Sequence, residues 1–485
     1  MKETNEGLQK SFGLRMAIIM VMSAIIGTGV FKKVAPMSEG LLSPSLVMLV
    51  WALAGVVILF GVLSIGELGA MFPASGGAFY WLEKTYGKVV AFLYGWSCFT
   101  VIQTAAIASV AYVFAGALGT FFTLPHLSPH LESITIFGII QPLDNIGAKI
   151  ITSLMIILLT FINIKGTKKG GNLSQIFTYT IVLSILLIVA FSLSSSVGSI
   201  ENLSTNSTSY PPSGFATSFG FLGIMVIAMR NAFWGYEGFI ALGFIGEELR
   251  EPRKNMPRAM LGGILMITLI YLLANFAYLY VMPIDELIAS LQADKNLIAA
   301  VVVVNKVFGT GGAYVVSAMI LVSTFGCTNA TILLSSRIYY AMGKDNMFFK
   351  DAGKTHPKHH TPHKSLIYQC IWACVLVFTG SFDLLTDLVV IAGFLFYGLV
   401  VFGVIILRVR KKDIFRPYKT WGYPIVPLVF VAVCIVLMVV SFIQSPVKAA
   451  MGMLLIFTGL PFYYYWKAKN KRLKAQELLD IKTVD

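Results

Sequence analysis

Charged residues are scarce in this sequence, because Asp, Glu, Lys and Arg together make up only 12% of its 485 residues. A soluble domain carries about 25%, and 57% of this chain is hydrophobic, so a soluble globular fold is excluded. Many apolar runs approach the ~20 residues with which a helix crosses a ~30 Å hydrocarbon core. We therefore expect an all-α polytopic membrane protein in a lipid bilayer, with residues 1–485 forming a single transmembrane domain.

Cysteine is equally scarce: the chain has five, and all lie in apolar segments. A disulfide framework is therefore not expected, and the histidines of segment 354–364 lack the cysteines or carboxylates of a metal site. We predict no metal site and no cofactor beyond a coupling ion. A membrane-embedded enzyme would need paired carboxylates facing each other inside the bilayer, whereas Asp383 and Asp387 fall at a loop edge. An enzyme is therefore not expected.

The net charge of +14 reflects the membrane topology, because the basic residues are unevenly distributed along the chain. Most Lys and Arg residues fall in alternate connections on the side of the N-terminus, so the positive-inside rule predicts both termini, including tail 467–485, in the cytoplasm of a cell-membrane protein. No nucleic-acid partner is expected. Hydropathy predicts twelve spans, at 14–36, 45–72, 88–122, 148–164, 173–196, 216–246, 260–282, 311–342, 366–381, 385–408, 423–443 and 447–466.

Two of these spans are interrupted by glycine and polar residues. The first contains "IIGTGVF" (25–31) and the sixth contains "AFWGYEGF" (232–239). Interrupted spans at matching positions of two halves point to a transporter binding site. Five spans separate the two positions, and an odd number turns the second half upside down. We predict a five-plus-five inverted repeat, with helices 1–5 at 14–196 and helices 6–10 at 216–408, in which helices 1 and 6 are discontinuous.

The breaks also suggest the ligand, because unpaired backbone groups in a membrane must line a cavity. Free N–H groups at the start of a half-helix attract a carboxylate, and free carbonyls at the end of the preceding half attract an ammonium. An α-amino acid satisfies both. We expect the amides of Thr28, Gly29 and Val30 to hold the carboxylate and carbonyls near Ile25 and residues 232–234 to hold the ammonium. The alternative for the glycines is close packing at a helix crossing.

Five segments carry a resemblance that covers nearly the whole chain. Together they resemble the amino acid–polyamine–organocation superfamily, and within it bacterial relatives of the L-type amino acid transporters such as serine/threonine exchangers. The resemblance implies the five-plus-five repeat followed by two helices at 423–466, and alternating access that usually exchanges one amino acid for another. The segments are "IIGTGVF", "FPASGGAFYWLEKTYGKVVAFLYGW" (72–96), "EELREPRKNMPRAM" (247–260), "STFGCTNATILLSSR" (323–337) and "RPYKTWGYPIVPL" (416–428).

The resemblance also implies roles for single residues. Trp234 falls where the family has an aromatic gate over the substrate, with core packing as the alternative, and Tyr236 and Gly238 fall in the unwound turn. The predicted substrate-binding residues are Ile25, Gly27, Thr28, Gly29, Val30, Ala232, Phe233, Trp234, Tyr236, Glu237, Gly238 and Asn329.

The chain departs from the family in its fifth helix. Many members carry a lysine there whose ammonium takes the place of sodium, whereas this chain has Thr180 and Ile181. Sodium coupling therefore stays open. The predicted coupling-ion ligands are Ser23 and Ile26 of the first helix and Ser323 and Thr324 of the eighth.

A second departure is Glu237, which lies inside the sixth-helix break where the animal members have a small residue. A carboxylate within a membrane is costly and functional by default. Three interpretations stay open: a structural partner, capping the turn or pairing with Arg230 two turns away; a carrier of the coupling proton; or a ligand for a cationic substrate.

The sequence thus favours a stand-alone secondary transporter of small, neutral L-amino acids, working by exchange or by sodium- or proton-coupled uptake. The rivals are a carrier of cationic amino acids or polyamines that uses Glu237, a non-transporting nutrient sensor and a membrane-embedded enzyme. The predicted outer loop 123–147 contains no cysteine. No disulfide-linked heavy subunit is therefore expected as a partner.

Overall fold

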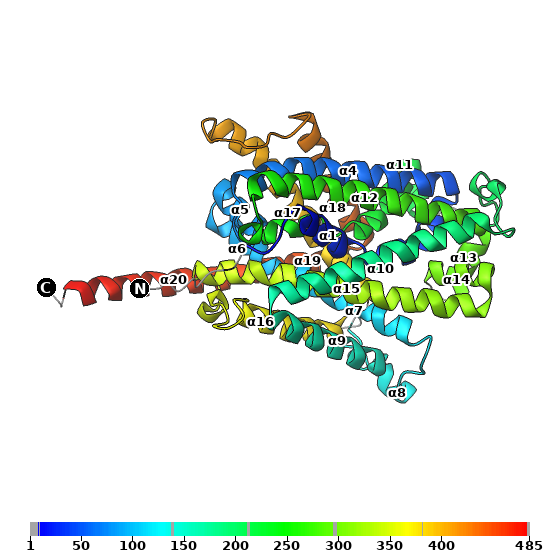
Figure 1. Cartoon of the computed structure of the whole chain (residues 1–485), viewed down its shortest axis with the longest axis horizontal. Coiled ribbons are helices and arrows are strands. Elements are labelled where there is room, and N and C mark those ends of the chain that lie inside the picture. Colours follow the sequence, from blue (N-terminus) through cyan, green and yellow to red (C-terminus); the bar gives the residue numbers. More distant parts are fainter. Residues whose placement is uncertain are drawn as a thin grey trace.

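The computed structural model describes residues 8, 10–136, 140–210, 214–293, 298–380 and 382–482. Within these ranges the chain is helical and forms no β-strand. The long helices run roughly along one axis of the molecule, and α20 projects beyond the others at one end (Figure 1). The α-helices are α1 (Leu14–Ile25), α2 (Gly29–Lys32), α3 (Val34–Leu41), α4 (Pro44–Met71), α5 (Ala78–Tyr86), α6 (Lys88–Ser97), α7 (Gln103–Leu118), α8 (Pro129–Glu132), α9 (Ile146–Ile164), α10 (Thr167–Ser194), α11 (Gly214–Gly235), α12 (Pro252–Val281), α13 (Ile284–Ala293), α14 (Ala299–Phe308), α15 (Thr310–Lys344), α16 (His363–Thr379), α17 (Phe382–Arg410), α18 (Ile425–Gln444), α19 (Pro446–Phe457) and α20 (Gly459–Lys482).

Nine helical segments of the described chain are long and apolar enough to cross a membrane, and each corresponds to one of the twelve predicted spans. This confirms the prediction of an all-α polytopic membrane protein. The remaining three spans are less regular: the first and sixth are broken, and the ninth is the 17-residue α16. The nine segments are Pro44–Met71, Lys88–Leu118, Ile146–Ile164, Thr167–Ser194, Pro252–Val281, Gly311–Lys344, Leu384–Arg410, Ile425–Gln444 and Pro446–Leu473.

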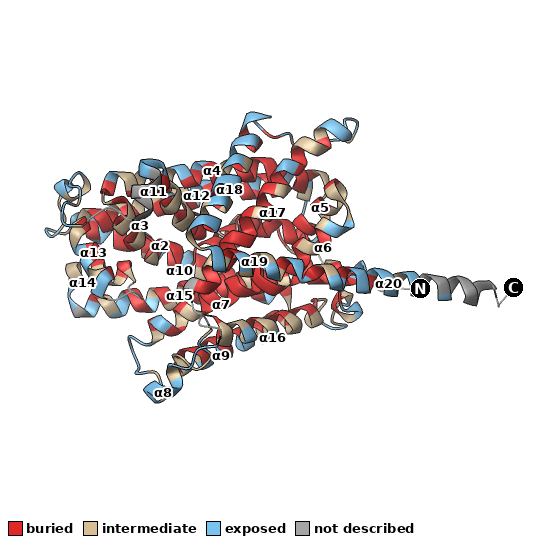
Figure 2. Ribbon diagram, turned by 180° about the vertical axis from the view of Figure 1, so that it is seen from behind, coloured by how far each residue is buried: buried red, intermediate tan, exposed pale blue. Residues whose placement is uncertain are grey.

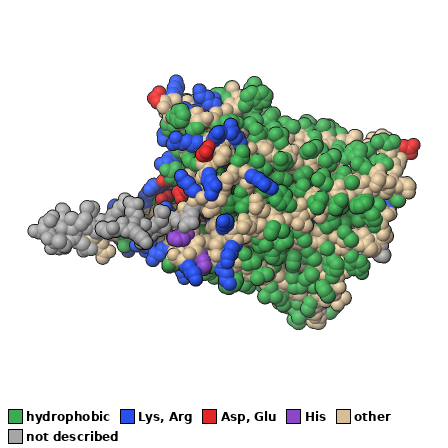
Figure 3. Space-filling model, in the orientation of Figure 1, with side chains coloured by type: hydrophobic (Ala, Val, Ile, Leu, Met, Phe, Trp, Pro, Cys, Tyr) green, Lys and Arg blue, Asp and Glu red, His purple; other side chains and the backbone are tan. Residues whose placement is uncertain are grey.

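The distribution of side chains fits a bilayer. Buried residues fill the middle of the bundle (Figure 2), while large apolar side chains such as Leu154 and Leu183, each 60% exposed, face outward. On the visible face, Lys and Arg gather at the end from which α20 projects, and hydrophobic side chains cover most of the rest (Figure 3). An apolar girdle with one basic end is the surface that lipid and the positive-inside rule require.

Both predicted breaks are present, and they lie against each other. Helix α1 ends at Ile25 and α2 begins at Gly29, whereas α11 ends at Gly235 and gives way to a short 3₁₀ turn at Ala241–Phe244. A Cβ on Gly29 would lie 2.4 Å from the Gly235 Cα, and one on Gly238, whose φ is +100°, would lie 2.6 Å from the Ala24 carbonyl oxygen. The two breaks therefore approach each other to a distance that only glycine permits.

Two buried ion pairs tie elements together at the basic end. The Arg337 guanidinium of α15 donates from Nε to Glu248 at 2.7 Å, and both side chains are 1% exposed. Glu67 of α4, also 1% exposed, accepts from Arg408 of α17 at 2.6 Å and from the backbone N–H of Thr420 at 2.7 Å. These bonds fix the segments before α12 and α18 to the bundle.

Some predicted boundaries need correction. The first span, 14–36, is divided among α1, α2 and α3, and the third contains a π-helical turn at Cys98–Ile102 between α6 and α7. The last span is divided near Thr458, and α20 then continues to Lys482. The region predicted as tail 467–485 is thus helical as far as it is described, because the residues after Trp466 continue the same helix to Lys482.

Candidate functional site

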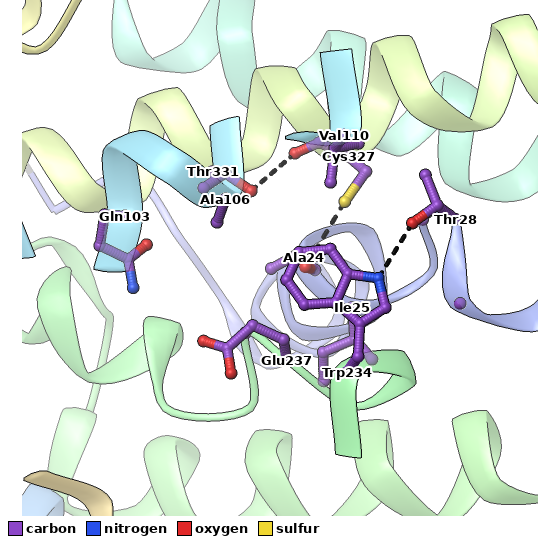
Figure 4. Close-up of a pocket in the computed structure, with 13 residues that line it drawn as sticks. Ala24, Ile25, Thr28, Gln103, Ala106, Val110, Trp234, Glu237, Cys327 and Thr331 are labelled. Carbon is purple, nitrogen blue, oxygen red and sulfur yellow. Dashed lines mark hydrogen bonds between the residues drawn. The ribbon is translucent and has the colours of Figure 1, made fainter. Parts of the chain in front are cut away.

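The two breaks border a cavity in the middle of the bundle (Figure 4). It leaves about 30 Å³ for the centres of water-sized molecules, which is room for about two waters. A larger ligand requires side chains to move. The lining residues come from α1 and α2, α7, α11 with the turn after it, and α15: Ala24, Ile25, Gly27, Thr28, Gly29, Gln103, Ala106, Val110, Trp234, Glu237, Gly238, Cys327 and Thr331.

Backbone donors are available at the first break. The Thr28 carbonyl starts α2 by accepting from the amides of Phe31 and Lys32, at 3.2 and 3.1 Å. Within the described part of the chain, the amides of Thr28, Gly29 and Val30 donate to no protein acceptor. These are the orphan donors of a helix start, and those of Thr28 and Gly29 belong to residues that line the cavity.

Carbonyl acceptors end both half-helices, and one side chain reaches both. The Tyr271 hydroxyl of α12 lies 3.1 Å from the Ile25 carbonyl oxygen and 2.8 Å from that of Gly235. A hydroxyl has a single proton to donate, so one of the two carbonyls keeps its acceptor capacity. The carbonyls of Phe233 and Trp234 already accept from the turn amides of Tyr236 and Glu237, at 3.0 and 3.2 Å.

Trp234 lies across the cavity with its ring buried. Its indole Nε1 donates to the Thr28 hydroxyl at 3.2 Å, so the two breaks are joined by a side-chain bond as well as by glycine contacts. Figure 4 shows this bond beside the cavity-lining residues of α15 and α7. One hydrogen bond and one ring thus connect the two breaks beside the cavity.

Glu237 faces the cavity and is bound by a residue that the sequence did not suggest. The hydroxyl of Tyr397, on α17, donates a hydrogen bond to the Glu237 carboxylate. No ion pair joins Glu237 to Arg230 among the described residues, which corrects the pairing interpretation. Helical spacing would have aligned the two, but α11 ends at Gly235 and the following turn carries Glu237 away.

Several predicted binding residues lie outside the cavity lining. Val30, Ala232 and Phe233 are packed in the core, and the Tyr236 hydroxyl donates to the Trp51 carbonyl at 3.3 Å. They shape the breaks rather than face the cavity.

Asn329 requires a correction, because it holds three helices together. Its side-chain amide donates to the Gly170 carbonyl and the Ser174 hydroxyl at 2.9 and 2.8 Å and accepts from Asn163 at 2.8 Å. These contacts join α15 to α9 and α10 and engage both ends of the amide. The Asn329 side chain therefore points away from the cavity.

The predicted ion ligands gather where α1 meets α15, but not all take part. The Ser23 hydroxyl lies 3.4 Å from the Gly326 carbonyl oxygen, and the Ser323 hydroxyl lies 3.4 Å from that of Ile26. Both distances are long for hydroxyl–carbonyl bonds, which centre near 2.7–2.8 Å. Thr324 instead donates to the Ile320 carbonyl of its own helix at 2.7 Å.

Sequence reasoning missed the wall contributed by α7 and α15. Gln103 begins α7 directly after the π-helical turn Cys98–Ile102, and such turns are frequent at functional sites. Tyr339 and Trp372 donate to the carbonyls of Cys98 and Thr100, both at 3.0 Å, and so support that turn. A buried glutamine in an apolar span was the one available signal for Gln103.

The bundle and its central cavity define a polytopic membrane protein with a polar site at two helix breaks. A family model described as amino acid permease matches residues 12–465, and the chain belongs to this family. The serine/threonine exchanger SteT of Bacillus subtilis is 30% identical over 472 residues, covering 97% of this chain and all of the relative. Large neutral amino acids transporter small subunit 2 of Homo sapiens is 30% identical, with 96% and 82% covered.

A third relative is b(0,+)-type amino acid transporter 1 of Rattus norvegicus, 28% identical over 94% of this chain and 88% of its own. These relatives are named as transporters or exchangers, not as enzymes. The chain is accordingly an amino acid transporter embedded in a membrane, and the predicted superfamily is confirmed.

Proposed function

We propose that this chain is a stand-alone secondary transporter of small, neutral L-amino acids that works by alternating access. The observation that carries the proposal is the cavity between the free amides of Thr28 and Gly29 and the carbonyls near Tyr271. A carboxylate fits the first group and an ammonium the second. Ala106, Val110 and Cys327 leave a small space for the substrate side chain, which favours serine, threonine or alanine over long cationic chains.

The mechanism follows from the way the cavity is closed. Trp234 acts as the gate: breaking its bond to Thr28 would open the cavity from one side. The close contact between the two breaks supports the five-plus-five inverted repeat over 14–196 and 216–408, and the nine regular spans support a total of twelve. Rocking of one repeat against the other would expose the site to each side of the cell membrane in turn.

Counterflow in proteoliposomes tests the proposal directly. We expect the purified chain to trade labelled L-serine against an internal pool of serine, threonine or alanine, without a second subunit. The SteT relative, a named serine/threonine exchanger, supports this choice of substrates. A chain that neither accumulates labelled amino acid nor exchanges it would contradict the proposal and leave a nutrient sensor as the better interpretation.

The role of Glu237 separates the rival substrates. If Glu237 holds a distal ammonium, Glu237→Gln abolishes transport of arginine, lysine or polyamines and spares alanine or serine. If the protein transports neutral amino acids, we expect the parent protein not to transport arginine, lysine or polyamines, so Glu237→Gln has no such activity to remove. If Glu237 carries a coupling proton, the same variant loses uptake driven by a pH gradient but keeps counterflow, because exchange needs no net proton movement.

Sodium coupling is proposed at the oxygens of Ser23, Ile26 and Ser323, which α1 and α15 bring together. Sodium prefers hard oxygen ligands, and the 3.4 Å separations leave these oxygens weakly engaged with each other. We expect uptake to rise when sodium replaces choline and Ser323→Ala to reduce that rise. Equal uptake with sodium and with choline would show that Ser23, Ile26 and Ser323 contribute to helix packing alone.

A further inference from the structure

A second pocket lies at the basic end of the bundle, away from the central cavity. The first two turns of α12 supply Arg253, Lys254 and Arg258, and Pro417 and Tyr418 of segment 411–424 close the other side around a volume of about 370 Å³. No Asp or Glu lines it. Three positive side chains therefore surround one space that nothing in the lining neutralises.

The three cationic groups are also without carboxylate partners in the part of the chain that the structure describes. By contrast, two buried carboxylates are paired with other arginines: Glu248 with Arg337, and Glu67 with Arg408. Like charges held around one space repel each other, and an anion placed among them relieves that repulsion. The pocket thus fits a ligand with net negative charge.

The wall opposite α12 is held firmly in place. Thr420, two residues after Tyr418, donates to buried Glu67 from its N–H at 2.7 Å and from its hydroxyl at 2.8 Å. Arg416 reaches the same carboxylate at 3.3 Å. Segment 411–424 is therefore anchored to α4 and α17 on both sides of the pocket residues, which makes the pocket a fixed feature rather than a chance gap in a loop.

The pocket continues into an apolar strip along α12. Lys254, Arg258 and Leu261 follow helical spacing on one face, and the same face runs on to Leu265 and Leu269, which are 52% and 59% exposed. The strip is charged at the end of the bundle and apolar toward its middle. This order matches a molecule with an anionic head and a hydrocarbon tail, not a free soluble anion.

The neighbouring surface places the pocket at the membrane boundary. Phe415 and Trp421 of segment 411–424 are 73% and 76% exposed, and aromatic side chains of this kind sit at headgroup level. The segment lies in the lobe at the top of Figure 1, and Figure 3 shows basic and hydrophobic side chains on that lobe, with acidic ones among them. A lipid headgroup is the anion available at this depth.

We propose that Arg253, Lys254 and Arg258 bind the phosphate-bearing headgroup of an anionic phospholipid, with an acyl chain along Leu261, Leu265 and Leu269. Basic pockets beside membrane helices are suited to such headgroups. Lipid binding at this site does not depend on the transported substrate, so the lipid site and the proposed transport function are tested independently.

Native mass spectrometry of the full-length, detergent-purified protein tests the proposal, with added phosphatidylglycerol or phosphatidylcholine. The test variant is Arg253→Gln/Lys254→Gln/Arg258→Gln. The control is Lys469→Gln/Lys471→Gln/Arg472→Gln, which removes the same charge from exposed positions of α20. We expect the pocket variant to lose phosphatidylglycerol affinity by at least about tenfold, with phosphatidylcholine binding unchanged and the control like the parent.

Four results would overturn the proposal. Equal losses in both triple variants would show a general effect of surface charge, and equal parental binding of the two lipids would rule out selection for an anion. Displacement of phosphatidylglycerol by excess inorganic phosphate or glycerol 3-phosphate would indicate a soluble phosphate site. Should the triple variant fail to fold, Arg258→Gln alone must still weaken phosphatidylglycerol binding, and full binding by that folded variant would reject the site.

Discussion

At the scale of single residues, Gly29 is the position where the two breaks touch. A methyl group there would lie 2.4 Å from the Gly235 Cα, which is backbone and cannot move aside as a side chain can. We expect Gly29→Ala to abolish serine counterflow and to lower the free energy of unfolding by about 1–3 kcal/mol or more, as for overpacking in a core.

The matched control for that change is Gly116→Ala on α7, where an added Cβ meets nothing within 4 Å. This substitution should leave transport intact and leave stability unchanged or slightly raised, because alanine is the better helix former. Thermal unfolding in detergent and counterflow measure both variants. A Gly29→Ala protein as active and stable as Gly116→Ala would show that the breaks do not depend on this contact.

Tyr271 is the residue that links the carbonyl ends of both half-helices. Tyr271→Phe removes the donor and leaves the Ile25 and Gly235 carbonyls without it. Leaving a buried acceptor without its donor costs about 1–3 kcal/mol, so we expect kcat/KM for serine exchange to fall by about 5- to 150-fold.

A second tyrosine of α12 provides the comparison. The Tyr278 hydroxyl is buried and has no hydrogen-bond partner in the described chain, so Tyr278→Phe removes the same atom without breaking a bond. We expect it to keep parental exchange kinetics. If the two variants lose the same activity, the effect comes from packing of α12 and not from the bonds of Tyr271.

At the scale of elements, the breaks were predictable and their surroundings were not. Glycines beside polar residues have low helix propensity, so they indicate a break when they occur within an apolar span. The segments "IIGTGVF" and "FWGYEGF" both show this pattern. The π-helical turn before Gln103, the two bonds of Tyr271 and the position of Asn329 between α9, α10 and α15 depend on which faces of distant helices pack together. The Arg230–Glu237 pairing failed because it assumed helical spacing beyond Gly235, where α11 ends.

The bonds of Glu67 to Arg408, Arg416 and Thr420, here called the Glu67 cluster, connect α4, α17 and segment 411–424. Their loss should lower the free energy of unfolding. Glu67→Gln removes the charge that Arg408 and Arg416 share and weakens the bonds from Thr420. Breaking a buried pair costs about 3–5 kcal/mol, and we expect the lower part of that range because Arg408 is 20% exposed.

Glu286→Gln is the control, since Glu286 pairs with Lys306 at a carboxylate that is 48% exposed. A surface pair contributes at most about 1 kcal/mol, so its thermal unfolding temperature in detergent should hardly change. Equal shifts in the two variants would mean that the Glu67 cluster does not hold α4, α17 and segment 411–424 together.

At the scale of the whole molecule, the basic end seen in Figure 3 predicts one orientation in the membrane. Segment 354–364, between α15 and α16, belongs to that end, and the connection between α10 and α11 belongs to the other. In a background with serine at all five cysteines, we expect Ser209→Cys to react with an impermeant maleimide on intact cells. Lys358→Cys should react only after permeabilisation, because the positive-inside rule places it in the cytoplasm; labelling of Lys358→Cys on intact cells would reverse the topology.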